Sequence, residues 1–250
     1  MLRSAKMNIA SNLKKSLYVA ICVFAFADMG FAQTTPPAAA PAKPYPAGFM
    51  DSTYRPKITA DKLAEFKANP IKADDYVFLG NSITARCDWA KLFNEPHAKN
   101  RGISGDLTFG VLERLDEVIA GHPKKIFILI GVNDISRNVP DSIIIRNHKR
   151  MIARIRAGSP ATEIYFCTIL PVNASFNKFV NHYGKDSHIL AINAAIKKYK
   201  AKKVNIIDLY PNFLDKDNHL IAEYTEDGLH PNEAGYKVWL KVFEKGGYLK

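Results

Sequence analysis

The stretch "KIFILIG" at residues 125–131 gives the clearest indication of the fold class. It is an unbroken apolar run, rich in β-branched and aromatic residues, that ends in glycine and does not alternate between apolar and polar positions. A strand with this pattern is buried on both faces, which is typical of a parallel sheet that is covered on both sides. More strands of this kind are therefore expected along the chain, with helices between them.

Similar runs occur on either side of this stretch. They are "DYVFLG" (75–80), "EIYFCTIL" (163–170), "VNIIDL" (204–209) and a weaker candidate, "AKNRGIS" (98–104). Apolar residues with helical period follow at 106–120, 141–157, 187–200 and 232–244. Strands that alternate with helices predict βαβ units and one parallel sheet of about five strands. Right-handed crossovers place the carboxyl ends of all strands at one edge, where ligands bind.

The N-terminus has the pattern of an export signal. Lys14 and Lys15 precede an apolar run at 17–27, and small residues follow at Gly30 and Ala32. This order predicts a signal peptide over residues 1–32, although an uncleaved anchor is the alternative. The apolar run is shorter than the roughly 20 residues that a membrane span needs, so no stable membrane insertion is expected after cleavage. We expect a periplasmic or extracellular protein.

Residues 33–48 are rich in proline and alanine and predict a linker. Residues 49–250 then form one folded domain, which is long enough to bury a substantial core. The sequence leaves its oligomeric state open.

The formal net charge is +11, and removal of residues 1–32 takes away four basic residues and one acid, which leaves +8. Charge alone permits a nucleic-acid partner. The lysines are scattered, however, and the predicted export separates the protein from nucleic acid, so we expect no such partner. Cys87 and Cys167 remain after cleavage, either as a disulfide or as two buried thiols. No Cys/His cluster has zinc spacing, so no metal site is predicted.

Three polar motifs follow the predicted strands. Ser82 lies in "GNSIT" (80–84), where a serine is commonly a helix N-cap, and the G-x-S-x-G elbow is absent. Gly105 in "NRGISGD" (100–106) allows a backbone N–H to approach a ligand closely, or simply forms a tight turn. Asn133 in "GVNDIS" (131–136) either presents its amide at the sheet edge or serves the turn.

The fourth motif is "DGLHPNEAGY" at residues 227–236. Asp227 and His230 have i, i+3 spacing, which places them on one side of a helical turn, and Pro231 suits the first helical position. A carboxylate there can fix the tautomer of a histidine that takes a proton from Ser82. Together the motifs supply a hydroxyl nucleophile, a base, an orienting carboxylate and oxyanion donors, which are the parts that acyl transfer needs.

These four motifs, in this order, resemble the SGNH (GDSL-type) hydrolase family over about residues 76–236. They are most similar to its platelet-activating-factor acetylhydrolase-like and carbohydrate acetylesterase branches. The resemblance implies a flavodoxin-like three-layer α/β/α sandwich. It implies that Ser82 is the nucleophile, that His230 is the base and that Asp227 is its partner. It also implies an oxyanion hole made by the N–H groups of Ser82 and Gly105 and the side chain of Asn133. No metal or organic cofactor is implied.

The first motif departs from the family pattern at two positions. Asn81 stands where the family usually has aspartate, and Ile83 stands where it has leucine. The aspartate is not a member of the triad, so the chemistry is expected to survive, while the local hydrogen bonding and the pH profile differ.

The resulting expectation is an exported carboxylic ester hydrolase, an acetylesterase that removes O-acetyl groups from a carbohydrate or glycan. A lysophospholipase or other lipid acyl-ester hydrolase is the first alternative, and a non-catalytic glycan-binding module on the same fold is the second. The long segment 171–186 is expected to shape the leaving-group pocket or only to pack as a loop. Its candidate substrate-binding residues are Phe176, Phe179, His182 and Tyr183.

Overall fold

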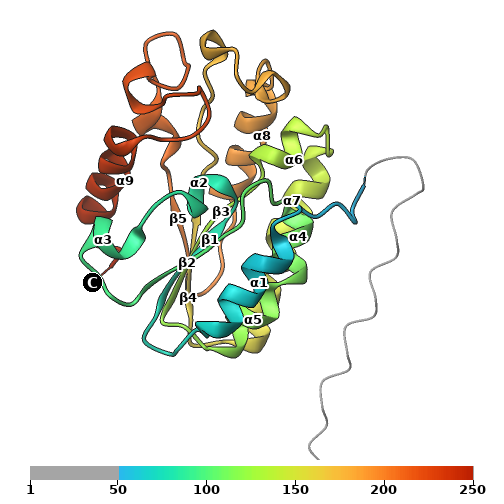
Figure 1. Ribbon diagram of the computed structural model, residues 1–250, viewed down its shortest axis with the longest axis vertical. Helices are drawn as coiled ribbons and strands as arrows, with labels where there is room; N and C mark the ends of the chain where they lie inside the picture. Colours follow the sequence, from blue (N-terminus) through green and yellow to red (C-terminus); the bar gives the residue numbers. More distant parts are fainter. Residues whose placement is uncertain (1–50, 250) are drawn as a thin grey trace, which may run out of the picture. The chain divides into compact units, whose positions relative to one another are not determined.

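A computed structural model describes residues 51–249, so the predicted signal peptide and linker lie outside the described residues. Five parallel strands form one sheet in the order β2-β1-β3-β4-β5 (Figure 1). The strands are β1 (Tyr76–Gly80), β2 (Ala98–Gly102), β3 (Lys125–Leu129), β4 (Glu163–Cys167) and β5 (Val204–Ile207). The prediction of a five-stranded parallel sheet in an α/β/α sandwich is confirmed.

Helices cover both faces of this sheet. The α-helices are α1 (Thr59–Ala68), α2 (Ser82–Ala85), α3 (Trp89–Phe93), α4 (Thr108–Glu113), α5 (Leu115–Ala120), α6 (Val132–Ser136), α7 (Asp141–Gly158), α8 (Asp186–Lys197) and α9 (Glu233–Gly246). Short 3-10 helices are η1 (Ala174–Phe176), η2 (Val180–His182), η3 (Tyr210–Phe213) and η4 (Ala222–Tyr224). Helices α3 and α9 lie on one side of the sheet, and α4, α5, α7 and α8 lie on the other (Figure 1).

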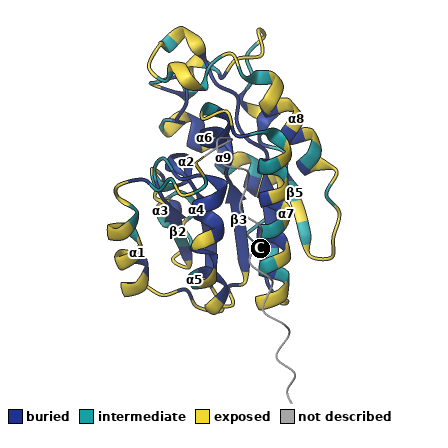
Figure 2. Cartoon of the chain, turned by 90° about the vertical axis from the view of Figure 1, so that its right-hand side faces the viewer, coloured by how far each residue is buried: buried dark blue, intermediate teal, exposed yellow. Residues whose placement is uncertain are grey.

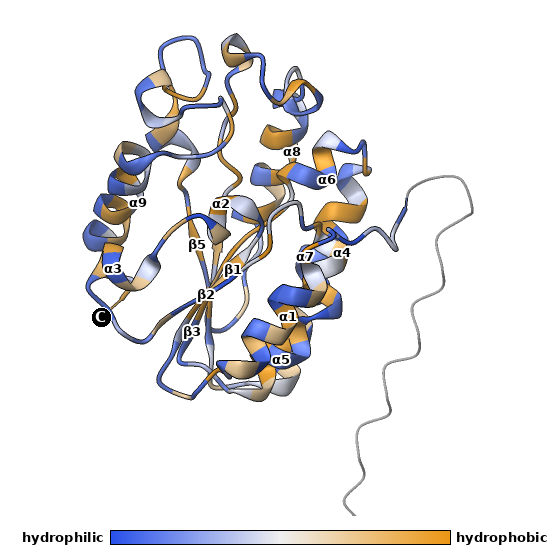
Figure 3. Ribbon diagram, viewed as in Figure 1, coloured by the Kyte–Doolittle hydropathy of each residue, from blue (hydrophilic) through white to orange (hydrophobic). Residues whose placement is uncertain are grey.

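The core lies between the sheet and its two helical layers. Every residue of β1 and β3 is buried (Figure 2), as expected for strands that are covered on both faces. Figure 3 shows mainly apolar strands, flanked by helices that carry both apolar and polar residues. On the α3/α9 side, Trp89 stacks on Phe78 with ring centroids 4.2 Å apart, and Trp239 packs edge-on against Trp89. These large rings bury much of the apolar area on that side.

Several elements differ from the sequence prediction in their extent; the strands predicted over 98–104, 163–170 and 204–209, for example, end at Gly102, Cys167 and Ile207. The helix predicted over 106–120 is two helices, α4 and α5, which break at Arg114, and α4 begins at Thr108. Asp106 precedes α4, and its carboxylate accepts hydrogen bonds from Arg114 Nε and Leu107 N. The strand predicted over 125–131 ends at Leu129, because Gly131 turns the chain with φ of +133°. Helices α1 and α6 were not predicted.

The last helix begins two residues later than its proline suggested, at Glu233. Asn232 is the N-cap of α9, and its side chain accepts a hydrogen bond from Gly235 N. Pro231 therefore precedes the cap instead of occupying the first helical position, and it pairs with Thr225 in an isolated bridge. The question left open for the cysteines is also answered, since Cys87 and Cys167 are both buried and free.

Candidate active site

Ser82 stands immediately after β1, at the carboxyl edge of the sheet. Gly80 ends the strand in a place where a Cβ atom would lie 2.3 Å from Leu129 O, so only glycine fits between the two strands. Asn81 then caps α2, and its side-chain oxygen accepts from Ile83 N at 3.0 Å. The capping role that a serine commonly plays at such a junction thus belongs to Asn81, which leaves the hydroxyl of Ser82 free.

Asp227 and His230 face the same way, but the reason is not a helix. The side chain of Asp227 accepts from Leu229 N at 3.0 Å and from His230 N at 2.8 Å through one oxygen. Thr225 Oγ1 donates to His230 O and accepts from Gly228 N, which closes the turn from the other side. The i, i+3 geometry that the sequence suggested is therefore made by side chains of a non-helical turn.

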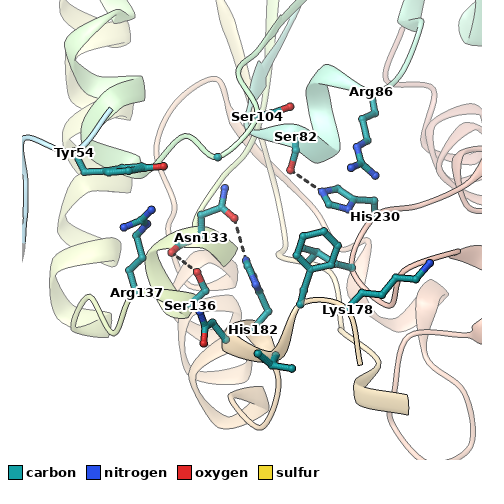
Figure 4. Close-up of a pocket in the computed structure, with 15 residues that line it drawn as sticks. Tyr54, Ser82, Arg86, Ser104, Asn133, Ser136, Arg137, Lys178, His182 and His230 are labelled. Carbon is teal, nitrogen blue, oxygen red and sulfur yellow. Dashed lines mark hydrogen bonds between the residues drawn. The ribbon is translucent and has the colours of Figure 1, made fainter. Parts of the chain in front are cut away.

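A chain of short hydrogen bonds joins Ser82 to Asp227. Ser82 Oγ lies 2.8 Å from His230 Nε2 (Figure 4). His230 Nδ1 lies 2.8 Å from Asp227 Oδ2, the oxygen not used in the turn. A carboxylate can only accept, so Nδ1 carries the proton and Nε2 is left to accept from the Ser82 hydroxyl. The structure brings Ser82 together with Asp227 and His230, which lie 145 and 148 positions later in the sequence.

The pKa shifts of Asp227 and His230 suit this pair to general-base chemistry. Burial raises the pKa of Asp227, but hydrogen bonds from the backbone and ring of His230 and from Leu229 N outweigh it and bring the pKa to about 2. Burial also lowers the pKa of His230, against the opposing effect of Asp227. At neutral pH the pair therefore consists of an ionised carboxylate and a neutral imidazole.

Arg86 is a further neighbour of this pair, which the sequence analysis missed. Its guanidinium lies 3.2 Å from Asp227 Oδ2, with about half of the side chain exposed. Its positive charge helps to lower the pKa of His230. No sequence signal links Arg86 to a residue 141 positions away.

The residues of the three predicted oxyanion donors, Ser82, Gly105 and Asn133, line the same cavity. Within residues 51–249, the N–H groups of Ser82 and Gly105 donate to no protein acceptor. Gly105 has φ of +83°, a backbone conformation that other residues reach only with strain. The surroundings of Asn133 explain how its amide is oriented. Asn133 Nδ2 donates to Asp106 O at 3.0 Å, which leaves its second hydrogen free.

His182 fixes the other end of the Asn133 amide. His182 Nε2 lies 3.1 Å from Asn133 Oδ1 (Figure 4). Because the bond to Asp106 O identifies the nitrogen of the amide, the oxygen must face His182, and His182 must donate from Nε2. Burial, followed by the charges of His230 and Lys185, lowers the pKa of His182 to about 4. His182 is therefore a neutral donor at the pH where the amide would work.

A buried polar framework positions the strand ends beneath these donors. Arg114 donates to Asp106 Oδ2 at 3.0 Å and to Gly80 O at 3.0 Å, so it ties β1 to the segment that carries Gly105. Asp134, next to Asn133, accepts from the backbone and hydroxyl of Thr108. Burial raises the pKa of Asp134 to about 7. Asp134, the acid of "GVND", thus joins α6 to α4.

The four candidate substrate-binding residues of segment 171–186 have different positions. Phe179 and His182 line the cavity above Ser82, and the ring centroid of Phe179 is 5.1 Å from that of His230. Tyr183 instead donates from its hydroxyl to Asp227 O, and Phe176 packs against Gly228. Tyr183 and Phe176 do not line this cavity and instead contact the turn that carries Asp227, so a substrate contact for them stays a prediction.

The cavity has a volume of about 520 Å³ and opens over Ser82 and His230. Its wall also includes Tyr54 and Arg137, which the sequence analysis missed because neither belongs to one of the four motifs. Figure 4 shows them next to Asn133, on the opposite side of the cavity from Arg86.

One group of side chains in the described part of the chain could hold a metal ion. Asp74, Asp75 and His97 bring one ligand atom each within 4.8 Å of one another. They precede β1 and β2, at the amino end of the sheet, whereas Ser82 lies at the carboxyl end. His97 Nδ1 already pairs with Asp74 Oδ2 at 3.1 Å, which accounts for the cluster without an ion.

Comparisons with known proteins agree with this geometry. Residues 78–238 match the sequence profile of the GDSL-like Lipase/Acylhydrolase family. The chain is 26% identical over 171 residues to Homo sapiens platelet-activating factor acetylhydrolase IB subunit alpha2, across 66% of this chain and 72% of the relative. A solved structure from Streptococcus pneumonia, named for platelet activating factor, has a TM-score of 0.67 at 30% identity over 78% of this chain and 92% of that chain. A GDSL-like lipase from Bacteroides thetaiotaomicron has a TM-score of 0.66 at 25% identity, over 75% and 96% of the two chains.

Proposed function

Because this chain belongs to the GDSL-like Lipase/Acylhydrolase family, we propose that it is an exported serine esterase that removes small acyl groups, above all acetyl, from a carbohydrate. The observation that carries the proposal is the hydrogen-bonded chain from Ser82 Oγ through His230 to Asp227. The predicted oxyanion donors Ser82, Gly105 and Asn133 line the same cavity.

In the proposed reaction, Ser82 Oγ attacks the ester carbonyl while His230 Nε2 takes its proton. Asp227 stabilises the imidazolium and keeps the ring in place. The N–H groups of Ser82 and Gly105 and the free hydrogen of Asn133 Nδ2 hold the developing oxyanion. Each such donor typically contributes about 10²–10³ in turnover, because it is already oriented when the charge develops.

His230 then returns the proton to the leaving alcohol, and an acyl-enzyme remains on Ser82. Water attacks this ester with His230 again as the base, and the carboxylic acid leaves. Ser82 Oγ regains its proton, so the cycle closes with no group other than those of this chain.

The cavity favours a small acyl group and a polar alcohol. Most of its lining residues are polar, and its apolar members are limited to Phe179, Val180 and Leu229 together with the ring of Tyr54. A long acyl chain would need a continuous apolar channel, because burying it against polar groups gains little. A hydroxyl-rich alcohol, in contrast, finds hydrogen-bond partners. The acetylhydrolase name of the mammalian relatives supports acetyl as the acyl group.

Export is supported by the basic pair and apolar run in residues 1–32. Across residues 51–249, the helices are too short or too polar to serve as a membrane span. Sequencing the N-terminus of the protein recovered from the periplasm or medium tests this part of the proposal, and a start near residue 33 is expected.

The test of the enzymatic proposal is turnover of p-nitrophenyl acetate by the parental protein and by Ser82→Ala. The variant should fold and lose activity to near background. Retained turnover in folded Ser82→Ala would refute the assignment. Comparison of acetyl with octanoyl esters separates the proposal from the lipid-ester alternative, since that alternative requires the longer chain to be preferred. Absence of turnover by the folded parental protein would leave the binding-module alternative.

A further inference from the structure

The wall of the cavity carries an unbalanced positive charge. Arg86, Arg137 and Lys178 all line it, and no aspartate or glutamate is among its lining residues. Arg86 pairs with Asp227, so the charge of Arg86 is matched. Lys178 Nζ donates to Glu226 O, a neutral carbonyl, so the charge of Lys178 is not matched by that contact. A concave wall with one sign of charge attracts ligands of the opposite sign.

Arg137 is the residue of this wall that is best prepared to bind an anion. The carbon atom of its guanidinium lies 3.6 Å from the ring centroid of Tyr54. Stacking on an aromatic face fixes the plane of the guanidinium and leaves its N–H edge free. Within residues 51–249, the Arg137 side chain makes no ion pair, and its guanidinium is not a donor in any of the side-chain hydrogen bonds described.

The nearby acid does not neutralise Arg137. Hydrogen bonds from Thr53 are the main cause of the lowered pKa of Asp51, and the charge of Arg137 is the smallest contribution. Asp51 is therefore occupied by its own turn, where it accepts from Thr53 N and Thr53 Oγ1. The fork of Arg137 is left available to a ligand.

The fold places the Arg137 guanidinium in the wall of the cavity that also contains Ser82. Arg137 is the C-cap of α6 and lies four residues, or about one helical turn, after Asn133. Figure 4 shows Arg137 and Tyr54 on the Asn133 side of the cavity, and Arg86 and Lys178 on the His230 side. An acetyl group fills little of a cavity of about 520 Å³, so the alcohol part of the substrate would reach these walls.

We propose that the alcohol part of the substrate carries an anionic group, a carboxylate or a phosphate, which Arg137 binds from its stacked position on Tyr54. A planar guanidinium binds either oxyanion through two parallel N–H···O bonds, and Lys178 adds attraction from the opposite wall. The inference rests on the proposed esterase function and narrows its substrate to acetylated sugar acids or acetylated sugar phosphates.

The test uses pairs of substrates that differ only in charge. One pair is an O-acetylated uronic acid and its methyl ester, and the other is an O-acetylated sugar phosphate and the same sugar without phosphate. The kcat/KM of the parental enzyme should be about tenfold or more higher for the charged member of at least one pair. That preference should decline as salt is raised. The pair that shows it identifies the source of the anion.

Two variants connect the preference to Arg137. Arg137→Gln removes the charge and should reduce the ratio of charged to neutral kcat/KM by about tenfold. Arg137→Lys keeps the positive charge but lacks the two parallel N–H donors of a guanidinium. Its ratio of charged to neutral kcat/KM should therefore lie between the ratios of the parental enzyme and Arg137→Gln. Lys149→Gln removes one exposed positive charge from α7, outside the cavity, and should leave both the ratio and the turnover unchanged.

The outcomes separate this inference from the proposed function. If p-nitrophenyl acetate is hydrolysed but neither charged substrate is preferred, the anion site is wrong and the esterase stands. The same conclusion follows if Arg137→Gln and Lys149→Gln lower the ratio equally, because the effect is then one of overall charge. If the folded parental protein does not hydrolyse p-nitrophenyl acetate, the proposed function itself is wrong.

Discussion

Replacement of His182 by alanine tests whether the orientation of one amide limits the rate. His182 Nε2 donates to Asn133 Oδ1 at 3.1 Å, while Asn133 Nδ2 donates to Asp106 O at 3.0 Å. In His182→Ala the first bond is lost and the second remains. The amide then keeps only one of the two contacts that point its nitrogen toward the substrate oxygen.

The expected loss follows from the value of that one bond. A neutral hydrogen bond contributes about 0.5–1.5 kcal/mol net, which corresponds to about 2- to 12-fold in rate. Removal of the donor itself in Asn133→Ala should cost about 10²–10³. We therefore expect His182→Ala to lower kcat by about 2- to 12-fold with KM for an aryl acetate nearly unchanged, because the interaction is made mainly in the transition state.

A double-mutant cycle of His182 and Asn133 tests whether the effect of His182 on kcat depends on the Asn133 amide. If His182 acts through Asn133, His182→Ala should have almost no effect on kcat in the Asn133→Ala background. His182→Gln should restore much of the activity, since the Gln Nε2 group can donate from a similar place. The matched control is His188→Ala, because His188 is exposed on α8 and pairs with Asp141.

Two results would refute this reasoning. Equal losses in the parental and Asn133→Ala backgrounds would show that His182 acts independently of the amide. A higher KM with unchanged kcat would show that His182 only contacts the substrate. The acid limb of the pH profile should be the same in His182→Ala and the parental enzyme, because the pKa of His182 is about 4 and the ring is already neutral.

Three further predictions concern the triad and the sheet. Asp227→Asn should lower kcat by about 10⁴-fold without unfolding the protein, as measured by steady-state kinetics and circular dichroism, and a loss below tenfold would contradict its orienting role. Activity requires neutral His230, so it is present above the pKa of that group and lost as pH falls through it. Arg86→Gln removes a charge that lowers this pKa, so the acid limb of kcat/KM should move to higher pH, and a shift to lower pH would contradict the assignment. Gly80→Ala places a Cβ 2.3 Å from Leu129 O and should destabilise the fold by about 1–3 kcal/mol or more, so an unchanged Tm in thermal unfolding would show that the strand ends can separate.

The fold was predictable because its signals are local. Apolar runs without alternation predict strands that are buried on both faces. The segments between them have apolar residues with helical period, so the pattern predicts a parallel sheet that is covered by helices on both sides. The boundaries were less predictable. Arg114, where α4 and α5 break, forms a buried ion pair with Asp106. Strand β3 ends just before Gly131, which has a positive φ. Neither feature changes the periodicity of the sequence.

The four motifs were sufficient to predict which of their residues come together. Ser82, Gly105 and Asn133 each follow a strand, and the carboxyl ends of these three strands lie at one edge of the sheet. The motif "DGLHPN", which comes last as in the family, contains Asp227 and His230. The parallel topology alone is enough to bring such strand ends together. The catalytic roles of these residues remain predictions until the variants are measured.

The orientation of the side chains in that site, and the residues that surround them, could be seen only in the tertiary structure. Asp227 and His230 face each other through a turn held by Thr225 instead of through a helix. The Asn133 amide is fixed by His182, which lies 49 positions later in the sequence. Arg137 stacks on Tyr54, which belongs to a segment that precedes the sheet. Such contacts depend on where long side chains end in space. Local sequence patterns encode period and turn chemistry, but they do not encode these distances.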